Sequence, residues 1–332
     1  AGSTGYIGVQ LIKLLIKHKY INIKYLCGNS SVGKNISFYD KSLSKFKLPR
    51  IVKFNKKMLD EVEVIFAALP NGQAQKLSKI LLKKNKLIDL SADFRLNKSS
   101  NYFKWYKVKH AAKHNINKSI YALPEIKKNE IKKFKIISCP GCYPTSILLP
   151  LIPLIKNKLI YEKNIVIDSK SGYSGAGRGV HKKYKDKNLY SSLSAYGVGV
   201  HRHNSEIQQE LENISKSKIQ FSFTPHLSPM FRGILTSIYI DLKKNINIDK
   251  ITNHLKKVYS KEKFIKVLKP NTWISTNDVI NTNYCHISVC KSTSKNKLII
   301  LSAIDNLIKG GAGQAVQNFN TMYDFNINNG LK

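Results

Sequence analysis

The 332-residue sequence lacks any apolar run long enough to cross a membrane. Its longest apolar runs, such as residues 147–155, contain prolines and fall well short of the roughly 20 residues that a spanning helix needs. The first residues also lack the charged region, apolar core and cleavage site of a signal peptide. We therefore expect a soluble protein that resides in the cytoplasm.

Cysteine is scarce, and its five positions are irregularly spaced: Cys27, Cys139, Cys142, Cys285 and Cys290. An odd number without regular spacing does not form a disulfide framework, so a reducing compartment is indicated. Cys139 and Cys142 have the spacing of a redox pair or of half a zinc site. Four residues separate Cys285 from Cys290, which does not complete a usual ligand set, and we expect no metal.

Arginine is rarer still. The sequence has 56 basic residues, of which five are arginines and 51 are therefore lysines, and its formal net charge is +36. Nucleic-acid-binding surfaces usually contain arginine for bidentate phosphate and base contacts, and here the lysines are spread along the whole chain. We interpret them as a solvated coat and expect no specific nucleic acid as a partner. A basic nucleic-acid-binding protein remains the alternative from a different functional class.

Apolar residues make up 42% of the chain, enough for a large core and, at this length, for two domains. In the first part, predicted strands alternate with helices, which is typical of a parallel sheet. These strands are residues 21–27, 62–69, 87–90 and 136–137. The second part has few predicted helices, and this pattern predicts a mixed or antiparallel sheet. Its strands are residues 164–168, 219–224, 233–241 and 284–289.

We therefore predict an α/β protein with a Rossmann-like NADP-binding domain and an α+β catalytic domain with a mixed or antiparallel sheet. The first domain comprises residues 1–140 and 305–332, because a helix at 305–322 is expected to return to it. The second, residues 141–304, is expected to carry the catalysis and the oligomer interface.

Three glycines, Gly2, Gly5 and Gly8, open a predicted helix. Glycine lets a backbone approach a pyrophosphate closely, and a helix N-terminus favours the negative charge. The spacing differs from the usual dinucleotide fingerprint, and we expect a first strand before Ala1. The cofactor-binding residues predicted here are Gly2, Ser3, Thr4, Gly5, Tyr6 and Ile7.

The end of the second predicted strand distinguishes the two nicotinamide cofactors. NAD sites usually place a carboxylate there to bind the ribose hydroxyls. This sequence has none, but Ser30, Ser31 and Lys34 could hold a 2′-phosphate. The sequence therefore favours NADP(H), with an ordinary polar loop as the alternative.

The segment 139–145 carries the sharpest motif. Cys142 follows a predicted strand and precedes an apolar helical stretch, and Pro144 suits a first helical turn. The macrodipole at a helix N-terminus favours the thiolate form of a cysteine. Cys142 is therefore the candidate nucleophile, against the alternative of a generic buried cysteine.

His201 and His203 flank Arg202, and a histidine in such a cluster could exchange a proton with a thiol. Glu206 could orient a histidine ring. A second segment, residues 171–179, is rich in glycine and hydroxyl groups that could cradle an anion. Four of the five arginines lie in Gly- or His-rich segments, which suggests bidentate binding of a carboxylate or phosphate. These are Arg95, Arg178, Arg202 and Arg232.

Eight segments in order resemble the N-acetyl-γ-glutamyl-phosphate reductases of arginine biosynthesis, over essentially the whole chain. They are residues 2–8, 89–95, 121–125, 140–145, 174–178, 201–203, 224–227 and 305–310. The resemblance implies the fold of aspartate-semialdehyde and glyceraldehyde-phosphate dehydrogenases and a reductive dephosphorylation by NADPH. It also implies a homo-oligomer, a dimer or a tetramer, that acts on a small acyl phosphate and releases inorganic phosphate.

The resemblance makes Cys142 the nucleophile, which forms a thioester, and His201 the first choice for the acid/base group, with His203 second. Gly175 joins the cofactor-binding residues. The substrate-binding residues are Arg95, Arg178, Arg202 and Glu206. A relative that acts on a longer or carrier-linked acyl phosphate, as in lysine synthesis through aminoadipate, remains an alternative, as does a non-catalytic NADP-binding protein.

Overall fold

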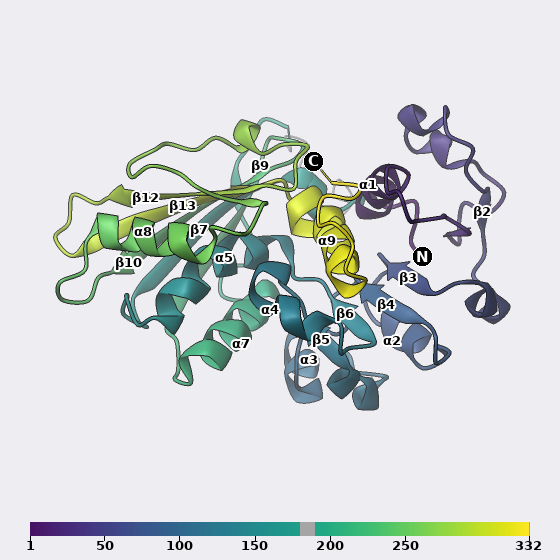
Figure 1. The fold of residues 1–332 in the computed structure, drawn as a ribbon, viewed down its shortest axis with the longest axis horizontal. Coiled ribbons are helices and arrows are strands. Elements are labelled where there is room, and N and C mark those ends of the chain that lie inside the picture. Colours follow the sequence, from purple (N-terminus) through teal and green to yellow (C-terminus); the bar gives the residue numbers. More distant parts are fainter. Residues whose placement is uncertain (180–189, 332) are drawn as a thin grey trace. The chain divides into compact units, whose positions relative to one another are not determined.

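The computed structural model describes residues 1–179 and 190–331, which form two compact units (Figure 1). Unit 1 comprises residues 1–140 and 311–332, and unit 2 comprises residues 141–310. The chain therefore leaves unit 1 after residue 140 and re-enters it at residue 311. The predicted re-entry point was residue 305.

Unit 1 contains only parallel strand pairs, as its alternating pattern predicted. One sheet pairs β1 (Leu26–Cys27) with β2 (Ile51–Val52), and the other has the order β3-β4-β6-β5. The strands of this second sheet are β3 (Val64–Ala67), β4 (Lys86–Asp89), β5 (Ser119–Tyr121) and β6 (Ile136–Ser138). The helices of unit 1 are α1 (Tyr6–Leu15), α2 (Gln73–Ser78), α3 (Ser99–Tyr106), α4 (Pro124–Ile131) and α9 (Gly313–Met322).

The first residues of the chain lie between β1 and β3. The carbonyl of Ala1 accepts a hydrogen bond from the N–H of Ala68 at 3.0 Å, and the N–H groups of Gly2 and Ser3 donate to the carbonyl of Cys27. A cavity of about 720 Å³ opens beside them, lined by side chains of α1, β1 and β3. The strands β1 and β3 therefore do not pair directly, which is why unit 1 has two sheets.

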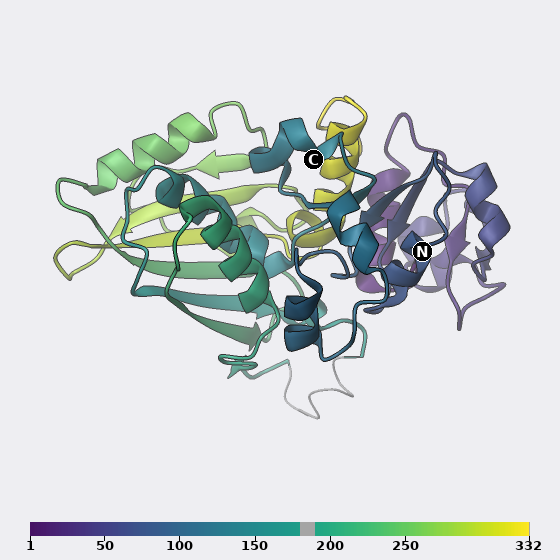
Figure 2. The same cartoon turned by 90° about the horizontal axis from the view of Figure 1, so that it is seen from below.

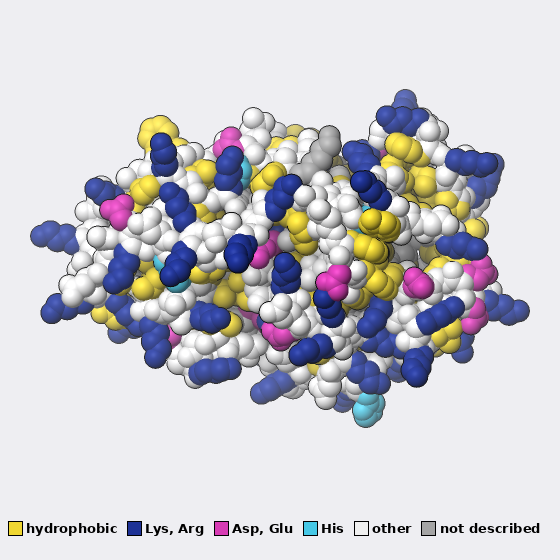
Figure 3. All heavy atoms as spheres, in the orientation of Figure 1, with side chains coloured by type: hydrophobic (Ala, Val, Ile, Leu, Met, Phe, Trp, Pro, Cys, Tyr) yellow, Lys and Arg dark blue, Asp and Glu magenta, His cyan; other side chains and the backbone are white. Residues whose placement is uncertain are grey.

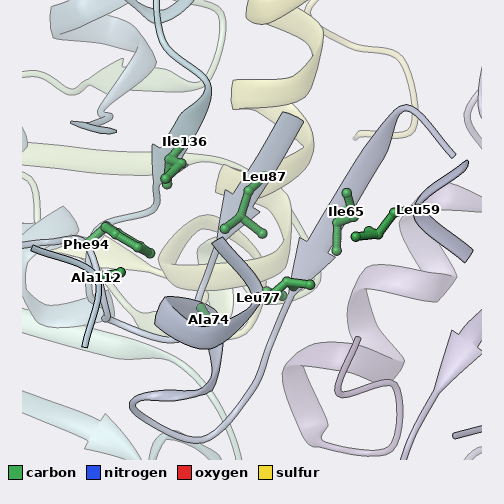
Figure 4. Packing of buried hydrophobic residues seen from close by; sticks show 9 residues of the cluster. Leu59, Ile65, Ala74, Leu77, Leu87, Phe94, Ala112 and Ile136 are labelled. Carbon is green, nitrogen blue, oxygen red and sulfur yellow. The ribbon is translucent and has the colours of Figure 1, made fainter. Parts of the chain in front are cut away.

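The core of unit 1 packs apolar side chains of β3, β4 and β6 against α2 and the neighbouring loops (Figure 4). In α1, the buried side chains recur at the three- and four-residue spacing of a helix with one apolar face. The helix α9 contacts α1, α4 and β4, so the C-terminal segment belongs to the same core. The prediction that this segment returns to the first domain agrees with these contacts.

Unit 2 holds a mixed sheet of seven strands in the order β11-β12-β13-β10-β7-β9-β8, which confirms the predicted sheet type. The strands are β7 (Ile165–Gly172), β8 (Ser194–Ala195), β9 (Phe221–Ser228), β10 (Ile234–Asp241), β11 (Ile265–Val267), β12 (Cys285–Lys291) and β13 (Lys297–Ile304). The helices are α5 (Cys142–Lys156), α7 (His203–Ser215) and α8 (Ile248–Val258). The helix α5 packs against β10 and β13 and also contacts α7 and α8. Figure 2 shows the strands of this sheet side by side from a second direction.

Several boundaries differ from the sequence predictions. Residues 21–25 are not in a strand, since only Leu26 and Cys27 find a parallel partner, in β2. The strand β13 was not predicted, although it pairs with both β10 and β12. Helix α8 was also missed, so unit 2 is more helical than expected. The last helix does not start at residue 305: a π-helical turn begins at Ile308, and α9 follows.

Among the described residues, no helix is long and apolar enough to cross a membrane. The basic side chains are scattered over the face drawn in Figure 3 and do not gather into one stripe. This distribution agrees with a solvated lysine coat.

Candidate active site

Cys142 is the first residue of α5, directly after the N-cap Gly141, which has extended backbone angles (φ −66°, ψ 159°). The chain can turn into the helix here because Pro144 fits the first helical turn. Cys142 is half-buried, so a substrate can reach its sulfur. The macrodipole of α5 stabilises negative charge on a thiolate at this position.

Two glycines lie beside Cys142, and both are held against other groups of unit 2. A Cβ atom on Gly310 would lie 2.6 Å from the Cβ of Cys142, and a Cβ on Gly141 would lie 2.4 Å from Nε2 of His203. Both distances are far shorter than van der Waals contact. The backbone at Gly310 and the ring of His203 therefore fix the surroundings of Cys142 from two directions.

A buried carboxylate connects this turn with the histidines. Glu206, in the first turn of α7, has 0% exposed surface and accepts a hydrogen bond from the N–H of Gly141 at 2.9 Å. Its other oxygen lies 3.8 Å from Nε2 of His203. Glu206 was predicted to contact the substrate, but this placement favours a role in positioning Gly141 and His203.

His201 is held differently. Its Nδ1 accepts a hydrogen bond from the N–H of His203 at 3.2 Å, which assigns the proton of the neutral ring to Nε2. Its ring makes edge contacts with Tyr143 at 5.6 Å, Tyr196 at 5.3 Å and Phe223 at 5.7 Å between centroids. His201 therefore lies in an aromatic cluster beside His203, whereas His203 is the histidine that touches Gly141.

Tyr143, the residue after Cys142, packs against both histidines of the site. It is 1% exposed and its ring contacts both His201 and His203. Its hydroxyl donates to the carbonyl of His226 at 2.9 Å and accepts from the hydroxyl of Tyr196 at 3.3 Å. Burial raises the pKa of Tyr143 far above its usual value, so it stays a neutral donor.

The second cysteine of the motif has a different environment. Cys139 is 1% exposed, and its sulfur accepts a weak hydrogen bond from the side-chain amide of Asn318 at 3.6 Å. Burial raises the pKa of the Cys139 thiol to about 12, so it is protonated at neutral pH. Cys139 is therefore not a second nucleophilic thiolate at neutral pH. Among the described residues, no cluster of histidine, cysteine or acidic side chains could hold a metal.

The glycine loop in unit 1 has the geometry of an anion-binding turn. Gly2 has a left-handed φ of 80°, and a Cβ on it would lie 2.1 Å from the carbonyl oxygen of Ala68. A Cβ on Gly8 would lie 2.2 Å from the carbonyl oxygen of Gly2. Gly5, the N-cap of α1, has more room, since its Cβ would approach nothing closer than 3.9 Å.

The predicted cofactor residues 2–7 thus bring the backbone to the N-terminus of α1, whose first N–H groups have no partner within the helix itself. The first turn contains no acidic residue that would repel a phosphate. This cradle fits the pyrophosphate of a dinucleotide.

The loop after β1 carries the predicted 2′-phosphate residues. Ser30 is exposed, and Lys34 is exposed with its ammonium group 4.2 Å from the ring of Phe38. Ser31 is 2% exposed and its hydroxyl bonds the hydroxyl of Tyr39. Ser30 and Lys34 are therefore the two side chains of this set that a ligand can reach.

The arginines divide into two groups. Arg95 is 8% exposed and donates from Nε to the carbonyl of Cys139 at 2.8 Å, within unit 1. Arg232 forms a two-pronged ion pair with the buried Asp305, at 2.8 and 3.0 Å. Arg178 and Arg202 are exposed on unit 2.

Gly175 lies in a 3₁₀ turn of unit 2, Tyr173–Ala176, where a Cβ on it would lie 3.2 Å from the hydroxyl of Ser171. The neighbouring Ser174 accepts a hydrogen bond from Asn306 at 3.0 Å. The glycine-rich loop is therefore tied to the end of β13 and its following turn. Its contact with a cofactor stays a prediction.

Three features of the site were not predicted from the sequence. They are the hydrogen bond from Gly141 to Glu206, the close approach of Gly310 to Cys142 and the cluster around Tyr143. Each of them joins residues that are far apart in the sequence. The glycine of the 305–310 segment was a visible signal, but nothing in its spacing indicated that it would touch Cys142.

Two family models match the chain. A semialdehyde dehydrogenase NAD-binding domain matches residues 1–134, and a semialdehyde dehydrogenase dimerisation domain matches residues 142–306. Together they cover most of the chain, and the unmatched residues 135–141 between them contain β6.

Curated relatives match along the full length. The chain is 44% identical over 333 residues to the N-acetyl-gamma-glutamyl-phosphate reductase of Thermoanaerobacter pseudethanolicus, covering 99% of this chain and 96% of that protein. It is 43% identical over 332 residues to the reductase of the same name from Vesicomyosocius okutanii, covering 100% of this chain and 96% of that protein.

Solved structures support the same fold at low identity. Aspartate semialdehyde dehydrogenase II from Vibrio cholerae has a TM-score of 0.71 at 16% identity, and the similarity covers 97% of each chain. The Candida albicans aspartate semialdehyde dehydrogenase, solved with NADP, has a TM-score of 0.69 at 17% identity and covers 98% of each chain.

Proposed function

The chain belongs to the N-acetyl-gamma-glutamyl-phosphate reductase family, and we propose that it acts as such a reductase in arginine biosynthesis. It reduces N-acetyl-γ-glutamyl phosphate to N-acetylglutamate 5-semialdehyde with NADPH and releases inorganic phosphate. The observation that carries the proposal is the half-buried Cys142 at the start of α5, with Gly310 and His203 close around it. This arrangement suits attack by a thiolate on an acyl phosphate.

The reaction follows from the position of the sulfur. The thiolate of Cys142 attacks the acyl carbon, and the bond from that carbon to the phosphate oxygen breaks, which leaves a thioester on Cys142. NADPH, when bound, supplies the hydride that reduces the thioester. The resulting thiohemiacetal collapses when its hydroxyl proton passes to the sulfur and its carbon–sulfur bond breaks, which frees the aldehyde and restores the thiol of Cys142.

Two proton transfers accompany these steps, and His203 is the better placed of the two histidines. It lies against Gly141, next to the nucleophile, and beside the carboxylate of Glu206, which stabilises a positive charge on the ring. His203 can take the proton of the thiol and later protonate the thiohemiacetal oxygen. His201, the first choice from the sequence, then orients His203 through the hydrogen bond between them.

NADP(H) is the proposed cofactor, and unit 1 provides groups for both of its phosphate regions. The backbone of residues 2–7 and the N-terminus of α1 would hold the pyrophosphate. Lys34 and Ser30 would hold the 2′-phosphate. No carboxylate stands at the end of β1 to select NAD.

The substrate carries a carboxylate and a phosphate, and the exposed Arg178 and Arg202 of unit 2 are suited to bind them. Arg95 contributes indirectly, since it holds the carbonyl of Cys139. We further propose that the enzyme is a homo-oligomer without a specific nucleic-acid partner. The cytoplasmic location expected from the sequence stays a prediction.

The decisive experiment is the reverse reaction with N-acetylglutamate semialdehyde, phosphate and NADP⁺, followed by the absorbance of the reduced nicotinamide. We expect phosphate-dependent reduction by the wild-type protein and none by Cys142→Ser. Cys290→Ser, which removes another half-buried thiol, is the matched control and should retain activity.

Binding of NADPH to Cys142→Ser, measured by titration, should be unchanged, since the glycine loop is intact. Near-wild-type turnover by Cys142→Ser would refute the thioester mechanism. Phosphate-dependent oxidation of the longer aminoadipate-derived semialdehyde, with reduction of NADP⁺, in place of N-acetylglutamate semialdehyde would refute the proposed substrate.

A further inference from the structure

The loop after β1 lies beside the backbone cradle that residues 2–7 form in unit 1. A Cβ atom on Gly28, the first residue of this loop, would lie 3.6 Å from Cγ2 of Thr4. The N–H groups of Gly2 and Ser3 donate to the carbonyl of Cys27, at the end of β1. A nucleotide whose pyrophosphate lies in the cradle therefore has its adenosine ribose within reach of this loop.

The backbone of Lys34, at the end of the same loop, is fixed, whereas its side chain is exposed. Its N–H donates to the carbonyl of Ser31 at 3.1 Å, and its carbonyl accepts from the N–H of Ile51, the first residue of β2, at 3.0 Å. Arg50 donates to the carbonyl of the preceding Gly33 at 2.9 Å. The position of the Lys34 ammonium group therefore depends on what the side chain itself contacts.

The contact that this side chain makes is aromatic and not ionic. The ammonium group of Lys34 lies 4.2 Å from the centroid of the Phe38 ring, and it pairs with no carboxylate of residues 1–179 or 190–331. Asp40, the next acidic residue along the chain, is paired with Lys13. An ammonium group at this distance is attracted by the electron-rich face of the ring. Lys34 therefore keeps its positive charge available to an incoming anion.

Phe38 is held in place by its neighbours, although it is 69% exposed. Ile36 is 2% exposed, and Tyr39 packs against the same core cluster. The ring of Tyr39 contacts that of Phe38 edge to face, at 5.3 Å between centroids, and its hydroxyl bonds the hydroxyl of the buried Ser31. The ring of Phe38 is therefore a fixed surface against which the flexible lysine side chain lies.

An exposed phenylalanine contributes little to the core of unit 1, but this one orders a cation. Ordering a lysine side chain costs rotamer entropy, and a phosphate that binds a freely rotating lysine loses affinity by that amount. A ring that already holds the ammonium group lowers this cost. The ring and a phosphate can contact the same ammonium group, because it has three N–H donors.

We propose that Phe38 is a positioning residue for cofactor specificity, and that its ring holds the ammonium group of Lys34 where the 2′-phosphate of NADP(H) binds. This inference rests on the proposed function in one respect, the assignment of Lys34 to the 2′-phosphate. Because Phe38 acts through Lys34, its contribution is confined to nucleotides that carry this phosphate. NADH has a hydroxyl at that position and gains nothing from the contact.

The experiment measures the Kd of the full chain for NADPH and for NADH by fluorescence titration, with no acyl phosphate or semialdehyde present. We expect Phe38→Leu to raise the Kd for NADPH about twofold to fivefold, the factor that an exposed cation–π contact represents, and to leave the Kd for NADH unchanged. Phe38→Tyr keeps the aromatic face and should retain both wild-type values. The matched control is Phe46→Leu, because Lys45 lies 5.6 Å from the Phe46 ring outside the loop 28–34. This control should change neither Kd.

A double-mutant cycle tests whether Phe38 acts through Lys34. We expect Lys34→Met to raise the Kd for NADPH about tenfold or more, because a charge-assisted hydrogen bond to a phosphate is lost. In that background, Phe38→Leu should have no further effect. Competition by adenosine 2′,5′-bisphosphate, compared with adenosine 5′-monophosphate, should show the same pattern without the nicotinamide.

Three results would overturn the inference. An equal loss of NADPH and NADH binding in Phe38→Leu would place the ring against a part that both nucleotides share, such as the adenine. A loss that persists in the Lys34→Met background would show that Phe38 does not act through Lys34. Unchanged NADPH binding in Lys34→Met would remove Lys34 from the 2′-phosphate site altogether. None of these titrations depends on the thioester mechanism, whose failure is detected separately with Cys142→Ser.

Discussion

Replacing Glu206 by glutamine tests how the buried carboxylate acts on His203. The variant keeps a carbonyl oxygen that can accept the N–H of Gly141, but it removes the negative charge 3.8 Å from Nε2 of His203. Unlike a truncation, this change removes little volume and preserves one of the two interactions. Its effect therefore isolates the electrostatic contribution.

The magnitude follows from that distance. A carboxylate and an imidazolium 3.8 Å apart attract by about 332/(20 × 3.8), or ~4 kcal/mol, at an effective dielectric constant of about 20. The His203 side chain is 17% exposed, so solvent screens part of this attraction. We expect about 1–2 kcal/mol of this attraction to remain after screening.

The assay is the pH dependence of kcat in the reverse reaction. Without the carboxylate, a positive charge on the His203 ring is less stabilised, so the limb of the pH profile that reports this group is expected to move to lower pH. We expect kcat to fall about tenfold to a hundredfold near neutral pH, with little change in KM. Glu210→Gln is the matched control, because Glu210 is a buried carboxylate one turn further along α7.

A structural role alone would give a different pattern. If Glu206 only held the Gly141 turn, Glu206→Gln would leave the pH profile in place, and this result would refute the electrostatic reasoning. Glu206→Ala should in addition lower the free energy of unfolding by about 1–3 kcal/mol, because it deprives a buried N–H of its acceptor.

Three further substitutions test other parts of the chain. Gly310→Ala should abolish turnover and slow alkylation of Cys142 by iodoacetamide, because the new Cβ would lie 2.6 Å from the Cβ of Cys142, while NADPH binding persists. Tyr143→Phe should lower the free energy of unfolding by about 1 kcal/mol in denaturant titrations, because it removes the buried hydrogen bond to the carbonyl of His226. Asp89→Asn tests how the protonation of Asp89 affects the stability of the fold. Burial, followed by a neighbouring carboxylate as the smaller cause, raises the pKa of Asp89 to about 6. As the pH rises from about 4 through 6, the free energy of unfolding of the wild type should therefore fall by up to ~3 kcal/mol relative to that of this variant. Equal pH dependence in the two proteins would contradict that assignment.

The sequence predicted what depends on local pattern. The apolar run before Pro70 and the motif around Cys142 identified β3 and the start of α5, because strand and helix signals are confined to a few residues. It did not predict β13, whose eight residues pair with β10 and β12. It also gave Ile21–Tyr25 as strand, although apolar alternation without a partner strand does not form a ladder.

The active site shows the same limit. The sequence could identify Cys142 as a candidate nucleophile, since a helix start is a local property. It could not show that Gly310 lies against Cys142, because the two are 168 positions apart and only the packed fold brings them together. The sequence also could not decide which of His201 and His203 is the better candidate for the acid/base group, because this depends on which ring lies against Gly141.

The hydrogen-bond and ion-pair partners of the arginines give a physical reason why these few positions carry arginine and not lysine. Lysine could not replace Arg232, whose planar guanidinium bonds both oxygens of a buried carboxylate, and Arg95 is buried with its Nε on a backbone carbonyl. Arg50 donates to a carbonyl of the loop after β1. These three arginines therefore hold the polypeptide itself. The substrate role that we propose for Arg178 and Arg202 depends instead on their exposure on unit 2 and on the paired donors that a guanidinium offers to a carboxylate or a phosphate.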